Sequence, residues 1–270
     1  MALPTKAQAL IAEFIAMTLF VFIGCGAAVA SEIKSTVTAD NPNQNAFDTL
    51  GVALAFGIGI AVLAYSIAPI SGGHINPAVT LAFMILKQMS IVDGLMYMVV
   101  QFIAGILGAL ILWGCTASYG ENGATPAGTS VTPYGLGANE VINIGDGSAF
   151  LVEAMGTFIL VWTVMMTAVH KKSIAGNIAP IAIGWSVFLA HIVLIPLTGC
   201  GINPARSAGP HIVNAIVGAA TPRGVWTFYV GPFVGSAVAA LSASTLMGCL
   251  EDSDEGEDDK ANDNKVDIDA

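Results

Sequence analysis

Two copies of one tripeptide carry the clearest chemistry in this sequence, at Asn76-Pro77-Ala78 and at Asn203-Pro204-Ala205. Asn before Pro is typical of a helix start, because Asn accepts from unpaired backbone N–H groups and Pro at the first helical position gives up a donor that has no partner there. The free N-terminal end of a helix carries about half a positive elementary charge. An Asn amide at such an end can orient a small polar molecule by hydrogen bonding, and no bond needs to be broken.

An apolar stretch too short to cross a bilayer follows each tripeptide. Residues 78–88 would form a helix of roughly 16 Å, whereas the hydrocarbon core is about 30 Å thick, and residues 205–217 are similar. Glycines lie just upstream, at Gly72-Gly73 and at Gly199 and Gly201. Each stretch therefore predicts a re-entrant segment that enters extended and leaves as a half-helix. Such backbone is tolerated at membrane depth where it lines a water-filled cavity or is buried in protein.

Membrane spans are the elements that must hold these segments. The 270 residues are 55% hydrophobic and 10% charged, against a usual charged share of about 25% in soluble domains, and the mean hydropathy is +0.75. Too few polar residues remain to cover a soluble core. Six apolar runs are long enough to cross a bilayer as helices, which satisfy their own backbone groups in lipid. These runs are residues 7–30, 47–68, 91–115, 148–169, 177–197 and 225–249.

The two halves of the chain repeat. Glu13 at the start of the first span has a counterpart in Glu153 at the start of the fourth, and one tripeptide follows each. We therefore predict an all-α membrane protein with six transmembrane helices and two re-entrant half-helices in an inverted repeat. The expected parts are an N-terminus, 1–6, a membrane domain, 7–249, with repeats at about 7–115 and 148–249, and a tail, 250–270.

Negative charge is concentrated at the C-terminus. Residues 251–270 hold ten of the 19 acidic residues and two lysines, a net −8 of the formal −10. A like-charged block of low hydrophobicity predicts a disordered, solvated tail. This charge also argues against nucleic-acid binding.

Lysine and arginine predict the orientation, since acidic residues count little. If the N-terminus is cytoplasmic, four lysines fall inside and two basic residues fall outside. The four are Lys6, Lys87, Lys171 and Lys172, and the two are Lys34 and Arg223. We expect both termini in the cytoplasm and favour the plasma membrane over an internal one.

Metal and catalytic chemistry find no support in the sequence. The four cysteines, Cys25, Cys115, Cys200 and Cys249, lie in or beside apolar stretches and show neither metal-ligand spacing nor a disulfide framework. No nucleophile–base set and no phosphate-binding loop occurs. We expect no metal, no cofactor and no enzymatic activity.

Two longer stretches, residues 71–80 and 198–207, resemble signatures of the aquaporin (major intrinsic protein) family, and the likeness extends over residues 7–249. The resemblance implies a passive transmembrane water channel of the water-selective type, driven by osmotic gradients and excluding protons and ions. It also implies a homotetramer in membrane lipid with one pore per subunit. The two Asn side chains would then orient one central water, while the half-helix ends oppose protons.

The resemblance places a selectivity filter on the extracellular side of the tripeptides. Counting from the motifs gives four residues, which we call the filter quartet: Phe56, His191, Cys200 and Arg206. Arg206 in an apolar segment is expected to face water and to repel cations. Beside it, Cys200 is expected to line the pore and to react with mercurials. The quartet is similar to that of water-selective members, as is Ser207, where glycerol channels usually carry Asp.

Several other polar residues need an interpretation. Glu13, Glu153 and Gln101 are interpreted as structural acceptors and donors for the re-entrant loops, in preference to a proton relay. His211 departs from the small residue usual in water channels. We interpret it as an exposed histidine without a role, with weak pH sensitivity as the alternative. Ser90 and Ser173 lie near lysines, and their phosphorylation could regulate the pore.

Two other functions compete with a water pore. One is a broader neutral-solute channel for glycerol, ammonia, hydrogen peroxide or carbon dioxide. The other is a secondary active transporter, which also uses inverted repeats and broken helices. The transporter is disfavoured, because no charged pair occurs in mid-span. A structural junction protein is a more remote alternative.

Overall fold

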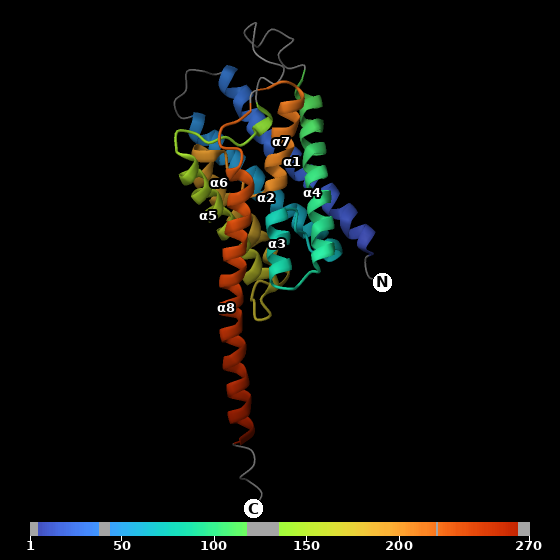
Figure 1. Ribbon diagram of the computed structural model, residues 1–270, viewed down its shortest axis with the longest axis vertical. Coiled ribbons are helices and arrows are strands. Elements are labelled where there is room, and N and C mark those ends of the chain that lie inside the picture. Colours follow the sequence, from blue (N-terminus) through green and yellow to red (C-terminus); the bar gives the residue numbers. More distant parts are fainter. Residues whose placement is uncertain (1–4, 38–43, 118–134, 220, 264–270) are drawn as a thin grey trace, which may run out of the picture.

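The computed structural model describes residues 5–37, 44–117, 135–219 and 221–263, without the side chains of residues 32–37, 44–47 and 249–263. All regular structure in this part of the chain is helical (Figure 1). The α-helices are α1 (Lys6–Val37), α2 (Gln44–Ser71), α3 (Pro77–Ile85), α4 (Ile91–Thr116), α5 (Asp146–Val164), α6 (Ala179–Thr198), α7 (Pro204–Ile216) and α8 (Thr227–Asp263). Three short turns are η1 (Gly135–Gly137), the π-helical η2 (Met165–Val169) and η3 (Gly176–Ile178).

Six of these helices are long and apolar enough to cross a membrane, as the apolar runs predicted. The spanning segments are Lys6–Ser31, Asp48–Ser71, Ile91–Thr116, Asp146–Val169, Gly176–Thr198 and Thr227–Gly248. Their outer faces carry exposed Ile, Val and Leu side chains, which suits contact with lipid. The predicted fold class is therefore confirmed, and the span limits differ from the expected ones by a few residues.

The two half-helices begin at the tripeptides. In α3, Asn76 has an extended backbone and its side chain accepts from Ala78 N, while Pro77 is the first helical residue. In α7, Asn203 accepts from Ala205 N and Arg206 N in the same way. These are the helix starts that the Asn-Pro pairs predict. α3 is shorter than the expected 78–88, because the chain turns away after Ile85.

The half-helices lie one above the other in the middle of the bundle, with α7 above α3 in Figure 1. Each packs against the last span of the other half of the chain, α3 on α8 and α7 on α4. The contact between α4 and α7 is very close: a Cβ added at Gly105 would meet Ala205 O at 2.4 Å, and one added at Gly209 would meet Gly105 O at 2.3 Å. Glycine is required at both positions, since any side chain would push the half-helix away from the span.

The first and fourth spans hold each half together. α1 packs on α2 and α4, α5 packs on α6 and α8, and the contact between α2 and α6 joins the two halves. At that contact a Cβ on Gly57 would meet Gly184 O at 2.8 Å. The equivalent pairings agree with an inverted repeat.

The C-terminal end of α8 lies in the segment for which a disordered tail, 250–270, is expected. α8 continues as a helix through Asp263, well beyond the spanning segment, and runs away from the bundle in Figure 1. Residues 264–270 lie outside the described part.

Candidate functional site

Two buried carboxylates hold the loops that lead into the half-helices. On α1, Glu13 Oε1 accepts from His74 N and Ser71 Oγ, both at 2.8 Å, and its Oε2 accepts from Ile75 N at 2.7 Å. Gln101 Nε2 on α4 donates to the same Oε2 at 2.9 Å. The carboxylate thus accepts from backbone N–H groups of the loop before α3, which have no partner in a helix.

The second half repeats this arrangement. On α5, Glu153 Oε1 accepts from Thr198 Oγ1 at 2.6 Å and from Gly201 N at 2.9 Å, while its Oε2 accepts from Ile202 N at 2.7 Å. Both glutamates are fully buried. Unpaired backbone N–H groups at this depth would cost about 1–3 kcal/mol each. All the acceptor oxygens of the two carboxylates are used within the fold, which leaves them poorly placed for a proton relay.

The two tripeptide asparagines tie the loops to each other. Asn76 Nδ2 donates to Ile202 O at 2.9 Å, and Asn203 Nδ2 donates to Ile75 O at 2.8 Å. Each Asn therefore caps its own half-helix through Oδ1 and reaches the opposite loop through Nδ2. Only one of the two amide hydrogens on each Nδ2 is needed for this contact.

A cavity of about 460 Å³ opens beside these asparagines. Asn76 and Asn203 line it together with His74, and most of its remaining wall is apolar, including Phe20 and Leu160. The N-terminal ends of both half-helices meet here, so two partial positive charges and two amides face a mostly apolar passage. This arrangement can hold a neutral hydrogen-bonding molecule and disfavours a cation.

Three side chains of the filter quartet, those of Phe56, His191 and Arg206, lie together. The Phe56 and His191 rings are stacked with centroids 4.4 Å apart, and Arg206 Cζ lies 4.8 Å from the Phe56 centroid. Cys200 lies on the loop that leads to Arg206. All four side chains are almost inaccessible: Phe56 0%, His191 1%, Cys200 0% and Arg206 2% exposed. The Cys200 thiol is therefore more enclosed than ready reaction with mercurials suggests.

Two polar atoms of the quartet have no partner among the described residues. His191 Nδ1 lies 2.8 Å from Val187 O, and because a carbonyl only accepts, Nδ1 carries the proton and Nε2 is left as an acceptor. Buried His191 Nε2 and Arg206 Nε both lack a hydrogen-bond partner. One acceptor and one donor are thus left without a protein partner.

Arg206 is held by neutral groups. Its Nη1 donates to Gly137 O at 2.9 Å and to Asn139 Oδ1 at 2.7 Å, and it forms no ion pair with any described carboxylate. Its hydrogen-bond partners in the described part are therefore neutral. Asn139 was not predicted from the sequence, because a single Asn in a long loop has no spacing signal.

His211 differs from the exposed histidine expected. It is 8% exposed, with Nε2 2.8 Å from Asn139 O and Nδ1 3.4 Å from Tyr229 Oη. The segment that follows η1 covers this side of α7, and such a long-range contact cannot be seen in the sequence around position 211.

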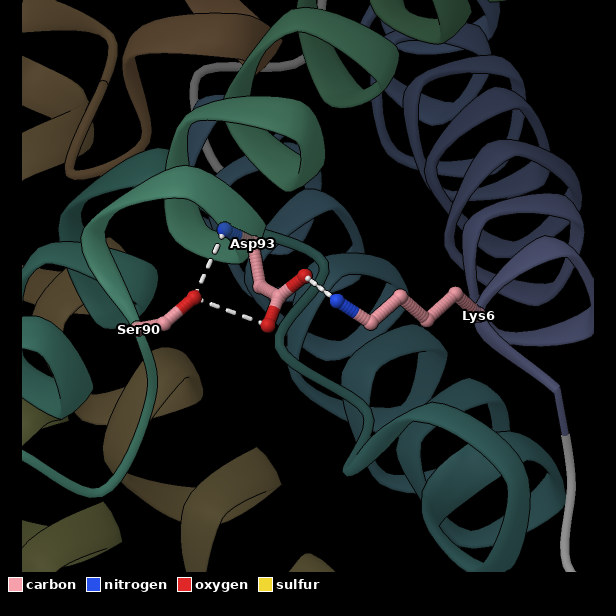
Figure 2. Close-up of polar contacts among 3 residues, drawn as sticks. All are labelled: Lys6, Ser90 and Asp93. Carbon is pink, nitrogen blue, oxygen red and sulfur yellow. Dashed lines mark hydrogen bonds and ion pairs between the residues drawn. The ribbon is translucent and has the colours of Figure 1, made fainter.

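The two candidate regulatory serines lie away from the quartet. Ser90 is exposed and caps α4; its Oγ contacts Asp93 Oδ2 at 2.8 Å, and Lys6 Nζ on α1 pairs with Asp93 Oδ1 at 2.7 Å (Figure 2). Ser173 Oγ donates to Thr167 O at 2.8 Å within the turn before η3. Neither serine contacts the cavity.

Over the described residues, no three His, Cys, Asp or Glu side chains gather as metal ligands.

Comparison with known proteins identifies a family, two similar relatives and a solved structure of similar fold. The model of the major intrinsic protein family matches residues 2–242. Aquaporin-1 of Rattus norvegicus is 40% identical over 239 residues, and that of Homo sapiens is 41% identical over 236; each match covers 87% of this chain and 80% of the relative. The X-ray structure of the aquaglyceroporin from Plasmodium falciparum superposes with a TM-score of 0.72 at 20% identity, covering 88% of this chain and 95% of that one.

Proposed function

Because this chain belongs to the major intrinsic protein family, whose aquaporin members are membrane channels and not enzymes, we propose that it is a passive water channel. Water moves along osmotic gradients, and protons and ions are excluded. The identity to Aquaporin-1 supports water as the permeant, whereas the likeness to the aquaglyceroporin, at 20% identity, supports the fold alone.

The unpaired atoms of the filter quartet carry the proposal. A water molecule can donate to His191 Nε2 and accept from Arg206 Nε, which have no other partner among the described residues. Phe56, stacked on His191, closes the apolar side of the constriction. A larger polyol must displace this aromatic wall or lose part of its hydration, and pore diameter and lining donors together set selectivity in aquaporin-type pores.

Ion exclusion is supported by the charges along the same path. Arg206 forms no ion pair with a described carboxylate and is held by neutral groups, so its positive charge opposes the entry of cations. Two half-helix ends add partial positive charges at Asn76 and Asn203. The amide hydrogens not used between the loops can orient a central water as donors, which interrupts proton hopping along hydrogen-bonded water.

The remaining features of the proposal concern the protein in its membrane. The polypeptide crosses the bilayer six times in two inverted repeats, within lipid, and assembles as a homotetramer with one pore per subunit. Lys6, Lys87, Lys171 and Lys172 favour cytoplasmic termini by the basic-residue rule. The plasma membrane is the proposed location. No nucleic-acid partner and no cofactor are part of the mechanism.

Stopped-flow light scattering on proteoliposomes tests the function. We expect fast shrinkage in a sucrose gradient with a low activation energy, and the same rate with or without sodium and proton gradients. A dependence of the rate on either gradient contradicts a channel. Glycerol entry as fast as water supports the alternative, a broader neutral-solute channel.

A further inference from the structure

We propose that His211 is a positioning residue, which holds Arg206 in the filter quartet through Asn139. The inference rests on the proposed function, since it concerns the same constriction. Neither His211 nor Asn139 belongs to the quartet or to the tripeptides. The two residues form a bridge between α7 and the segment after η1.

Asn139 forms hydrogen bonds through both its side chain and its backbone. Its side-chain Oδ1 accepts from Arg206 Nη1 at 2.7 Å and from Ser207 Oγ at 2.8 Å. Its backbone oxygen lies 2.8 Å from His211 Nε2. Because a carbonyl oxygen only accepts, Nε2 carries a proton and donates, which leaves Nδ1 as an acceptor facing Tyr229 Oη at 3.4 Å.

The contacts follow one side of α7. Arg206, Ser207 and His211 all bind Asn139, and Asn214 Nδ2 donates to Gly135 O at 2.7 Å one turn further along. Ser207, His211 and Asn214 are spaced by four and three residues and share a helix side, and Arg206 directly precedes Ser207. Arg206 donates to segment 135–139. The same half-helix, α7, also carries the side chains that hold this segment in place.

Segment 135–139 depends on these contacts for its shape. Gly135, Leu136 and Gly137 all have positive φ, at 52°, 52° and 64°, a conformation that Leu136 does not favour alone. Within the segment, the backbone bond that holds the turn is Ala138 N to Gly135 O at 3.0 Å. Tertiary contacts therefore fix its position, namely the hydrogen bonds to α7 and the packing of buried Leu136 in the core.

Burial makes the His211 bond costly to lose. Asn139 and Ser207 are fully buried, and Arg206 is nearly so. Without the donor, the Asn139 carbonyl either stays unpaired, which costs about 1–3 kcal/mol, or moves to reach another donor. Such a movement displaces Oδ1 and, with it, the guanidinium that borders the constriction.

The His211 ring could instead act by packing, since its centroid lies 5.7 Å from that of Phe228 and 6.3 Å from that of Tyr229. Two substitutions separate packing from donation. His211→Leu keeps the apolar volume and loses the donor, while His211→Gln keeps an amide donor and loses the ring. Ile212→Leu, at an exposed position on the same half-helix, is the matched control.

The experiment measures the ratio of glycerol to water permeability in proteoliposomes of the full-length protein. We expect the ratio to rise about tenfold in His211→Leu, the effect of losing about 1.4 kcal/mol of discrimination. His211→Gln and Ile212→Leu keep the wild-type ratio. A wild-type ratio in His211→Leu overturns the proposal. An equal rise in the Leu and Gln variants would also overturn it, because it would show that His211 acts by the packing of its ring and not by its hydrogen bond.

A measurement on the wild-type protein covers the case in which His211→Leu does not fold. Nitrogen-15 NMR of histidine-labelled protein, with the signal assigned by His211→Gln, should show the Nε2-protonated tautomer at position 211. The Nδ1-protonated tautomer overturns the proposal. If glycerol crosses the wild-type channel as fast as water, the proposed water selectivity is wrong. The NMR measurement would still show whether His211 Nε2 donates to Asn139 O.

Discussion

The imidazole of His191 is stacked on the ring of Phe56, with 4.4 Å between the centroids and an interplanar angle of 23°. The two residues come from α6 and α2, the pair of spans that joins the halves of the molecule. Arg206 lies over the same phenyl ring, so the three side chains form one cluster. In the proposed channel, selectivity would therefore depend on the contact between the two halves.

Opening this constriction should admit larger solutes. The double substitution His191→Ala, Arg206→Val removes a ring and a guanidinium that lie against Phe56, and we expect glycerol permeability to rise by about tenfold or more, which corresponds to about 1.4 kcal/mol of lost barrier. The measurement is glycerol uptake by proteoliposomes. Val193→Ala, on the exposed side of α6, is the control. Unchanged glycerol exclusion in the double variant would show that the constriction lies elsewhere.

Mercurials should block water flow through Cys200. The thiol belongs to the quartet but is fully buried, so we expect inhibition that develops slowly and is absent in Cys200→Ser. Cys115→Ser changes an exposed thiol on α4 and should leave inhibition intact. Osmotic shrinkage rates measured against time after mercurial addition test this. Persistent inhibition in Cys200→Ser would place the reactive thiol at another cysteine.

The loop carboxylates should matter for stability. Glu153→Leu leaves the backbone N–H groups of Gly201 and Ile202 without their acceptor, and each buried unpaired group costs about 1–3 kcal/mol. We expect a lower midpoint of thermal unfolding in detergent. Glu140→Gln, at an exposed position, is the control. An unchanged midpoint in Glu153→Leu would mean that other groups hold this loop.

Close packing of the half-helix should tolerate no side chain at Gly105. A Cβ there would lie 2.4 Å from Ala205 O, and overpacking of this kind costs about 1–3 kcal/mol. We expect Gly105→Val to lower both the unfolding midpoint and the water permeability per folded channel. At Gly114 a Cβ would meet no atom within 4 Å, so Gly114→Ala should preserve both. Equal behaviour of the two variants would contradict the close α4–α7 contact.

Much of the fold could be predicted from hydropathy and two motifs. Lipid forces long apolar runs to be helices, which is why the six spans differ little from the predicted ones. The Asn-Pro pairs gave the starts of α3 and α7, because capping is a local property. The end of α3 was less well predicted, since local turn geometry after Ile85 has no strong sequence signal.

The site could be predicted in part. Quartet residues came from spacing relative to the tripeptides, a regularity that the family resemblance supplied. Asn139 and the buried state of His211 could not be predicted, because both depend on a loop that folds back on α7 from about 70 residues away. The disordered tail over 250–270 stays a prediction, which rests on its acidic composition.

The reflection coefficient of glycerol, measured with wild-type proteoliposomes, tests the central claim most directly. In one sample, shrinkage in a glycerol gradient is compared with shrinkage in a sucrose gradient of equal osmolarity. A water-selective pore predicts the same rapid shrinkage in both, with no re-swelling above that of protein-free liposomes in glycerol. Rapid re-swelling in glycerol would contradict the claim that Phe56, His191, Cys200 and Arg206 restrict passage to water.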